Sequence, residues 1–150
     1  MSEAPHRFWE DLVVGETFIS RPMTVTLDEI IDFANRYDPQ YFHNDAELAK
    51  DSHFGEIVAS GIHILALWRI LDHEITGNVR WMCGIGWDNL RWNKPMRAGD
   101  RIRARAECLS KRESSSDAAR GIAVYRYSLL NQDDEELFYC DSTNLVERRA

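Results

Sequence analysis

The stretch "FGEIVASGIHILALWRILDHEITG", residues 54–77, decides how the rest of the chain must fold. Ser60 is a favourable N-cap residue, so a helix is predicted to begin at Gly61. From Ile62 to Leu71 the residues are apolar on nearly every face of that helix, with two exceptions. A helix that is apolar on all sides is a buried helix. The sequence therefore predicts a central helix that other elements must wrap.

The two exceptions are His63 and Arg69. A charge on a buried helix must be paired or must reach an edge, and Asp72 and His73 are neighbours that Arg69 could use at helical spacing. We interpret His63, in the first helical turn, as a hydrogen-bonded packing residue rather than a chemically active one.

The residues after this helix supply the covering sheet. Four segments have the composition of strands and are separated by polar turns such as "NQDDEE", residues 131–136. They are "MCGIGWDNLRW" (82–92), "RIRARAECLSKR" (101–112), "AARGIAVYRYSLL" (118–130) and "ELFYCDSTNLVERR" (136–149). Consecutive strands joined by short turns form an antiparallel meander. We therefore predict an α+β fold, an antiparallel sheet curled around one buried helix, in a single domain covering residues 1–150.

A strand and a helix are predicted before the central helix. The stretch "ETFISRPMTVT", residues 16–26, alternates loosely and is rich in β-branched residues, so it predicts a strand in which Pro22 marks an edge or a bulge. Thr26 can cap a helix, because Glu29 follows three residues later and apolar residues continue at helical spacing to residue 37.

The segment "YDPQYFHND", residues 37–45, follows this helix. Pro39 disfavours helical geometry at Asp38, so the helix is predicted to end at Asp38 and to leave His43 in the loop beyond it. Residues 45–50 can form one further helical turn. A carboxylate and an imidazole five residues apart belong either to an ordinary surface turn or to half of an acid–base site.

Composition narrows the class of protein. The net charge of −7 argues against nucleic acid as the main partner, and no apolar run approaches the roughly 20 residues that span a membrane. The N-terminal stretch "MSEAPHRFWEDL" lacks the apolar region of a secretory signal. Cys83, Cys108 and Cys140 are odd in number and widely spaced, which favours reduced core residues over disulfides or a zinc site. We therefore expect a cytoplasmic protein with no bound metal.

Positive charge gathers in one segment of the chain. Its members are Arg91, Lys94, Arg97, Arg101, Arg103, Arg105, Lys111 and Arg112. On a strand, Arg101, Arg103 and Arg105 share one face. The simpler interpretation is a solvated strand face; the alternative is a docking patch for a nucleotide phosphate or an acidic carrier protein.

Three segments in order, "YDPQYFHND", "FGEIVASGIH" and "RWNKPMRAGD", resemble the MaoC-like (R)-specific enoyl-CoA hydratase family of hotdog-fold proteins. The resemblance covers roughly residues 18–146. The first segment resembles the family's hydratase signature through Asp38, Pro39, Gln40 and His43. It departs from the pattern because many members carry asparagine and then proline just before the histidine, whereas here Gln40 and Tyr41 intervene. This departure puts the size of the substrate in question more than the type of reaction.

The resemblance implies a hydratase or dehydratase that interconverts a trans-2-enoyl thioester and an (R)-3-hydroxyacyl thioester of coenzyme A or acyl carrier protein. Asp38 and His43 would share the proton transfers through one water molecule. The backbone N–H of Gly61, at a helix start, would stabilise charge on the thioester oxygen. The other residues expected at the substrate are Ser60, Tyr41, His63, Arg91 and Lys94. No cofactor is implied.

Two other interpretations stay open: a non-catalytic hotdog protein that binds acyl thioesters or serves a structural role, and a thioesterase on the same fold. A binding module has no need for both Asp38 and His43, which favours the enzyme. The resemblance also implies a homodimer whose sheets join edge to edge, and such pairing would protect an exposed strand edge. Trp81, Trp87 and Trp92 are expected in the core or in that interface.

Overall fold

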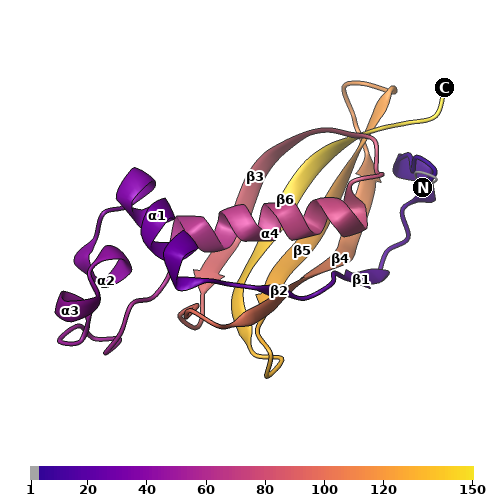
Figure 1. Ribbon diagram of the computed structural model, residues 1–150. Coiled ribbons are helices and arrows are strands. Elements are labelled where there is room, and N and C mark those ends of the chain that lie inside the picture. Colours follow the sequence, from indigo (N-terminus) through magenta and orange to yellow (C-terminus); the bar gives the residue numbers. More distant parts are fainter. Residues whose placement is uncertain (1–3) are drawn as a thin grey trace.

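The computed structural model describes residues 4–150, in which one long helix lies across one curved sheet (Figure 1). The first three residues of the N-terminal stretch interpreted above lie outside the described residues. The helices are the 3-10 helix η1 (Trp9–Asp11), α1 (Leu27–Tyr37), α2 (Tyr41–Asn44), α3 (Ala46–Ala49) and α4 (Gly61–Thr76). The strands are β1 (Thr17–Ile19), β2 (Met23–Thr24), β3 (Trp81–Trp92), β4 (Arg101–Glu113), β5 (Arg120–Leu130) and β6 (Glu136–Glu147). The predicted α+β class is confirmed.

The antiparallel sheet has the strand order β1-β4-β5-β6-β3, with β2 also paired to β4. The predicted meander is correct for β4, β5 and β6 but wrong for β3, which pairs with β6 and forms an edge. The segment that links β3 to β4 is too long for a tight hairpin. Its backbone pairs instead with the residues that precede α4. Met96 O accepts a hydrogen bond from Ala59 N at 2.9 Å, and Arg97 forms a bridge with Val58. The link therefore lies against the segment that leads into α4.

The predicted strand over residues 16–26 is split into β1 and β2. The break contains Pro22, which has no N–H to donate to a neighbouring strand. Ser20, also in the break, accepts a hydrogen bond from Ala104 N through its Oγ at 2.8 Å. β1 lies at the opposite sheet edge from β3, as expected for a strand next to a proline.

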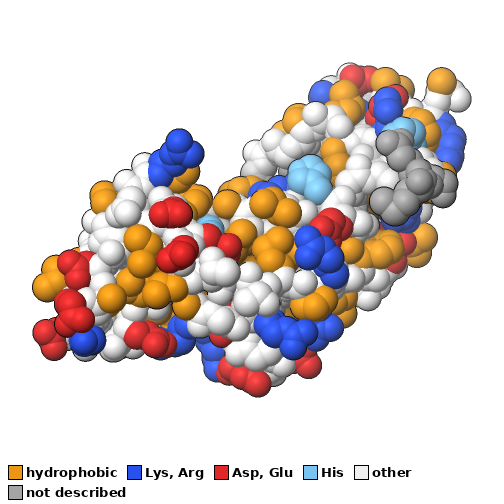
Figure 2. Space-filling view, in the orientation of Figure 1, with side chains coloured by type: hydrophobic (Ala, Val, Ile, Leu, Met, Phe, Trp, Pro, Cys, Tyr) orange, Lys and Arg blue, Asp and Glu red, His pale blue; other side chains and the backbone are white. Residues whose placement is uncertain are grey.

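Helix α4 begins at Gly61 as predicted, and the Oγ of Ser60 accepts a hydrogen bond from Ile62 N. Its inner side packs into the core through Ile64, Trp68 and Leu71. The prediction that α4 is buried on all sides is wrong, because the sheet covers one side of it. Figure 2 shows apolar side chains gathered along its outer side, where the residues Ile62 and Ile70 are 54% and 53% exposed. Within residues 4–150, no helix is long and apolar enough to cross a membrane.

Several side chains depart from the expected core because β3 is an edge strand. Cys108 and Cys140 are buried as predicted, but Cys83, on β3, is exposed. Trp87 and Trp92 are each 48% exposed, so neither is a core residue in the single chain.

Candidate active site

Asp38 lies where α1 ends. The helix is capped at its start by Thr26, whose Oγ1 accepts a hydrogen bond from Glu29 N, and it stops before Pro39 as predicted. Asp38 is the C-cap residue, with a φ of −157°, so its carboxylate leaves the helix surface. That side chain is 29% exposed, which leaves room for a small molecule beside it.

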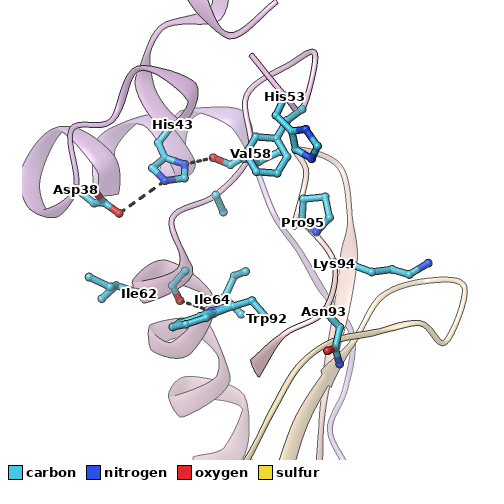
Figure 3. A pocket seen from close by; sticks show the side chains of 13 residues that line it. Asp38, His43, His53, Val58, Ile62, Ile64, Trp92, Asn93, Lys94 and Pro95 are labelled. Atoms are coloured by element: carbon cyan, nitrogen blue, oxygen red, sulfur yellow. Dashed lines mark hydrogen bonds and ion pairs between the residues drawn. The ribbon is translucent and has the colours of Figure 1, made fainter. Parts of the chain in front are cut away.

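His43 faces Asp38 from α2 (Figure 3). The expected loop is here a single helical turn that begins two residues after Pro39, so the prediction of a loop was wrong. His43 is 7% exposed, and its Nδ1 lies 2.6 Å from the carbonyl oxygen of Val58. A carbonyl only accepts, so Nδ1 carries the proton and Nε2 of the neutral ring keeps a free lone pair. Nε2 lies 3.7 Å from Asp38 Oδ2, too far for a direct hydrogen bond but suited to sharing one water.

Ser60 connects Asp38 to the start of α4. It is fully buried, its hydroxyl donates to Asp38 Oδ2 at 2.7 Å, and its Oγ accepts from Ile62 N at 3.3 Å. Ser60 therefore lies behind the cavity wall, where it fixes the carboxylate relative to the helix N-terminus.

Gly61 is the first residue of α4 and lines the same cavity. Its backbone N–H has no acceptor among residues 4–150, as is usual in a first helical turn. Its carbonyl oxygen accepts from Trp92 Nε1 at 3.1 Å. A Cβ at position 61 would lie 2.8 Å from Trp92 Cε2, so the close packing of this indole requires glycine.

These groups surround a cavity of about 570 Å³, which is of the size of a small-molecule site. Its lining consists of Asp38, His43, His53, Phe54, Val58, Ala59, Gly61, Ile62, Ile64, Trp92, Asn93, Lys94 and Pro95. Figure 3 shows Asp38 and His43 on one side, with Lys94 and Asn93 away from them. No role was predicted for His53 or Phe54, and Trp92 was expected in the core or in the subunit interface rather than at the cavity. Phe54 and Trp92 lie in two of the segments that resemble the family, and this position was the signal that could have placed them at the site.

Four predicted substrate contacts are not part of this lining, and one of them is Ser60, which lies behind the cavity wall. Tyr41 is 44% exposed and packs edge-on against Phe42. His63 is buried and stacked on Phe33, with ring centroids 4.5 Å apart, and its Nδ1 has no partner within the described chain. Its predicted packing role is confirmed, but it was also expected to be hydrogen-bonded, and Nδ1 forms no such bond within residues 4–150. Arg91 lies on the edge strand β3.

The basic segment is divided by the fold. Lys94 lines the cavity and is paired with Glu135. Arg103 and Arg105 are ion-paired with Asp134 and Glu107, at 3.2 Å each. Arg101 and Arg103 border a separate hollow with Pro22 and Gln132. Lys94 is thus the cation of this segment that the structure places at the cavity.

Comparison with known proteins agrees with this geometry. The model of the MaoC like domain matches residues 11–126. The chain belongs to the MaoC-like dehydratase family. It is 28% identical over 140 residues to the uncharacterized protein YdeM of Bacillus subtilis, covering 93% of this chain and 98% of that protein. It is 33% identical over 85 residues to 3-hydroxyacyl-thioester dehydratase Z of Mycobacterium tuberculosis, covering 55% of this chain and 56% of that protein.

Solved structures share the fold over nearly the whole of this chain. The MaoC-like dehydratase from Rhodospirillum rubrum superposes with a TM-score of 0.87 at 34% identity, covering 96% of this chain and 99% of that one. A Mycobacterium tuberculosis protein with a double hotdog fold superposes with a TM-score of 0.79 at 15% identity, covering 96% of this chain and 45% of that one. The fold of this MaoC-like protein is therefore the hotdog fold, as the sequence predicted.

Proposed function

We propose that this MaoC-like protein adds water to a trans-2-enoyl thioester, and removes it from the (R)-3-hydroxyacyl thioester, on coenzyme A or acyl carrier protein. One observation carries the proposal. The free lone pair of His43 Nε2 and the carboxylate of Asp38 face each other at 3.7 Å on the wall of a cavity that also contains the start of α4. A related Mycobacterium tuberculosis protein bears the name 3-hydroxyacyl-thioester dehydratase Z, which supports the same chemistry.

The geometry suits a short sequence of steps. A water held between Asp38 Oδ2 and His43 Nε2 gives one proton to the pair as its oxygen bonds to the β-carbon of the enoyl group. Charge that moves onto the thioester oxygen accepts a hydrogen bond from the Gly61 N–H, where the helix dipole is positive. The pair then returns one proton to the α-carbon, so that one water has been added. Ser60 positions Asp38 throughout by its hydrogen bond.

Lys94 is proposed to attract the phosphate groups of the thioester carrier. It lies at the cavity, although it is paired with Glu135 in the free protein. Lys94→Glu should raise KM for a coenzyme A thioester several-fold and change kcat little, because uniform binding is lost. Arg103→Glu, at the separate hollow, is the matched control. An equal rise of KM in both variants would instead indicate a general electrostatic effect.

We also propose that the protein forms a homodimer in which β3 of one subunit pairs with β3 of its partner. Within the described chain β3 pairs only with β6, so its other edge is free, and Met82, Ile85 and Trp87 are each about half exposed there. An apolar free edge is a surface that proteins normally cover. This chain covers 45% of a protein that has a double hotdog fold, which supports the pairing of two such units.

The test of the activity is a panel of enoyl and 3-hydroxyacyl thioesters of varied chain length, on coenzyme A and on acyl carrier protein, with chiral analysis of the product and a parallel assay for free thiol. Hydration to the (R)-3-hydroxyacyl thioester supports the proposal. Thiol release without hydration would assign a thioesterase. If neither coenzyme A nor carrier-protein thioesters react, a non-catalytic binding role replaces the enzyme.

A further inference from the structure

The turn between β5 and β6 is the acidic segment "NQDDEE", residues 131–136, and the proposed reaction gives it no role. It lies beside the cavity of the candidate active site, because β3 and β6 are antiparallel and the end of β3 meets the start of β6. The backbone N–H groups of Asn93 and Lys94 both donate to Leu137 O, at 2.8 and 3.3 Å. The strand pairing therefore brings the carboxylates of the turn next to these two polar lining residues, which Figure 3 shows away from the catalytic pair.

Both polar residues are held by glutamates of the turn. Asn93 Nδ2 donates to Glu136 Oε1 at 3.1 Å, and the ammonium group of Lys94 is paired with the carboxylate of Glu135. The side chain of Lys94 is half exposed, and that of Glu135 is 38% exposed. An ion pair with this exposure to water contributes little to stability, so an anionic ligand can break it at small cost.

Glu135 is fixed in place independently of Lys94. Asn131 is buried, and its Oδ1 accepts hydrogen bonds from the backbone N–H groups of Asp133 and Glu135, at 2.9 and 3.0 Å. Asn131 Nδ2 also donates to Glu135 Oε1 at 3.2 Å. The turn therefore presents a fixed carboxylate, whereas Lys94, with its flexible four-carbon stem, is the partner that can move.

A phosphate that reaches this part of the cavity competes with Glu135 for the same ammonium group. Phosphate oxygens accept short, charge-assisted hydrogen bonds from lysine. A phosphate that contacted Lys94 while the ion pair stayed intact would place its charge beside the carboxylate, and like charges repel. The best contact with phosphate therefore forms only after Lys94 has left Glu135. A carrier without phosphate is not affected by this competition.

We infer that Glu135 sets how tightly the protein binds thioester carriers that bear phosphate groups, because it holds Lys94 until a phosphate displaces it. This inference rests on the proposed function, in which Lys94 attracts the phosphates of the carrier. It assigns the acidic turn to selection of the carrier. Glu135 is a positioning residue that acts through Lys94, and its charge restrains the affinity for coenzyme A.

The first experiment compares but-2-enoyl-CoA with but-2-enoyl-pantetheine, which lacks phosphate. Glu135→Gln should lower KM for the coenzyme A thioester about fivefold and leave kcat and the KM for the pantetheine thioester unchanged, because only a contact to phosphate is gained. The glutamine keeps an oxygen that can accept from Asn131, so the turn is retained.

Glu107→Gln is the matched control. Glu107 lies on β4, is paired with Arg105 and has a side chain 31% exposed, so its exposure is close to that of Glu135. This control should leave both KM values unchanged. The inference is overturned if Glu135→Gln leaves KM for the coenzyme A thioester unchanged, if it lowers KM equally for both thioesters, or if the control has the same effect.

The second experiment tests whether Glu135 acts through Lys94. In a Lys94→Met background, Glu135→Gln should change KM for the coenzyme A thioester by less than about twofold, because no ammonium group remains to be released. A fivefold fall that persists without the lysine would show that the carboxylate repels phosphate directly, and it would overturn the inference.

Failure of the hydratase proposal gives a different result. Calorimetry with coenzyme A and with pantetheine measures binding without turnover. If the parent hydrates no thioester, but Glu135→Gln binds coenzyme A about fivefold more tightly than the parent and pantetheine no more tightly, the role of Glu135 stands without the reaction. Equal affinity of the two proteins for coenzyme A, or no binding by either, overturns it.

Discussion

At the scale of single residues, Asp38 and His43 are expected to act as one unit. Asp38→Asn removes the carboxylate and His43→Ala removes the free lone pair, so each should lower kcat by about 100-fold or more on the best enoyl thioester. Both contact the same proposed water, so the double variant should lose little more than either single variant. Steady-state kinetics on folded protein checks this. Losses that multiply in the double variant would show independent roles.

Ser60 permits a sharper test, because the chain has a second N-cap to compare with it. Ser60→Ala removes a cap and the hydrogen bond to Asp38, whereas Thr26→Ala removes only a cap, on α1. Each should destabilise the protein by about 1 kcal/mol in urea unfolding. Only Ser60→Ala should also lower kcat, by about tenfold. Equal kinetic effects of the two changes would mean that Ser60 acts only through stability.

The residues of the site were predictable where a local rule fixes the backbone. Pro39 ends α1 at Asp38, and Ser60 starts α4 at Gly61, so both positions followed from the sequence. No role was predicted for His53, and Trp92 was expected in the core or the interface, because both reach the cavity through tertiary contacts between segments far apart in the chain. The tautomer of His43 likewise depends on Val58, fifteen residues away, and no local pattern encodes it.

At the scale of elements, the packing of α1 on α4 should make stability depend on pH. His63 of α4 is stacked on Phe33 of α1, and burial lowers its pKa from 6.5 to about 4. Below pH 6.5 the unfolded chain therefore binds a proton that the folded protein excludes, so stability present at neutral pH is lost as pH falls toward 4. Between pH 7 and pH 5 this loss is about 2 kcal/mol.

Urea unfolding of the parent and of His63→Phe at both pH values isolates this contribution. The phenylalanine keeps the ring stacking and has no titrating group, so the variant should lose about 2 kcal/mol less than the parent between pH 7 and pH 5. Equal losses of unfolding free energy in the two proteins would mean that His63 binds its proton in the folded protein without losing its contact with Phe33.

Elements were predicted better than their pairing. Residues 82–92 have strand composition, and β3 forms there, but composition does not say which neighbour a strand finds. The link after β3 bonds to Ala59 and Val58, which carries the chain past β6 and leaves β3 at the edge. The same fact explains why Cys83 and Trp87 are exposed. The error in the topology and the errors in burial thus have one cause.

At the scale of the whole molecule, the two edges of the sheet should behave differently, and each carries an exposed isoleucine. Ile85 on β3 is 59% exposed and Ile19 on β1 is 53% exposed. If dimers form through β3, the parent should sediment at twice the 17.4 kDa chain mass at micromolar concentration. Ile85→Arg would bring two like charges together across the two-fold axis and should yield monomers, whereas Ile19→Arg should stay dimeric. A monomeric parent would exclude the dimer, and dissociation by Ile19→Arg alone would move the interface to β1.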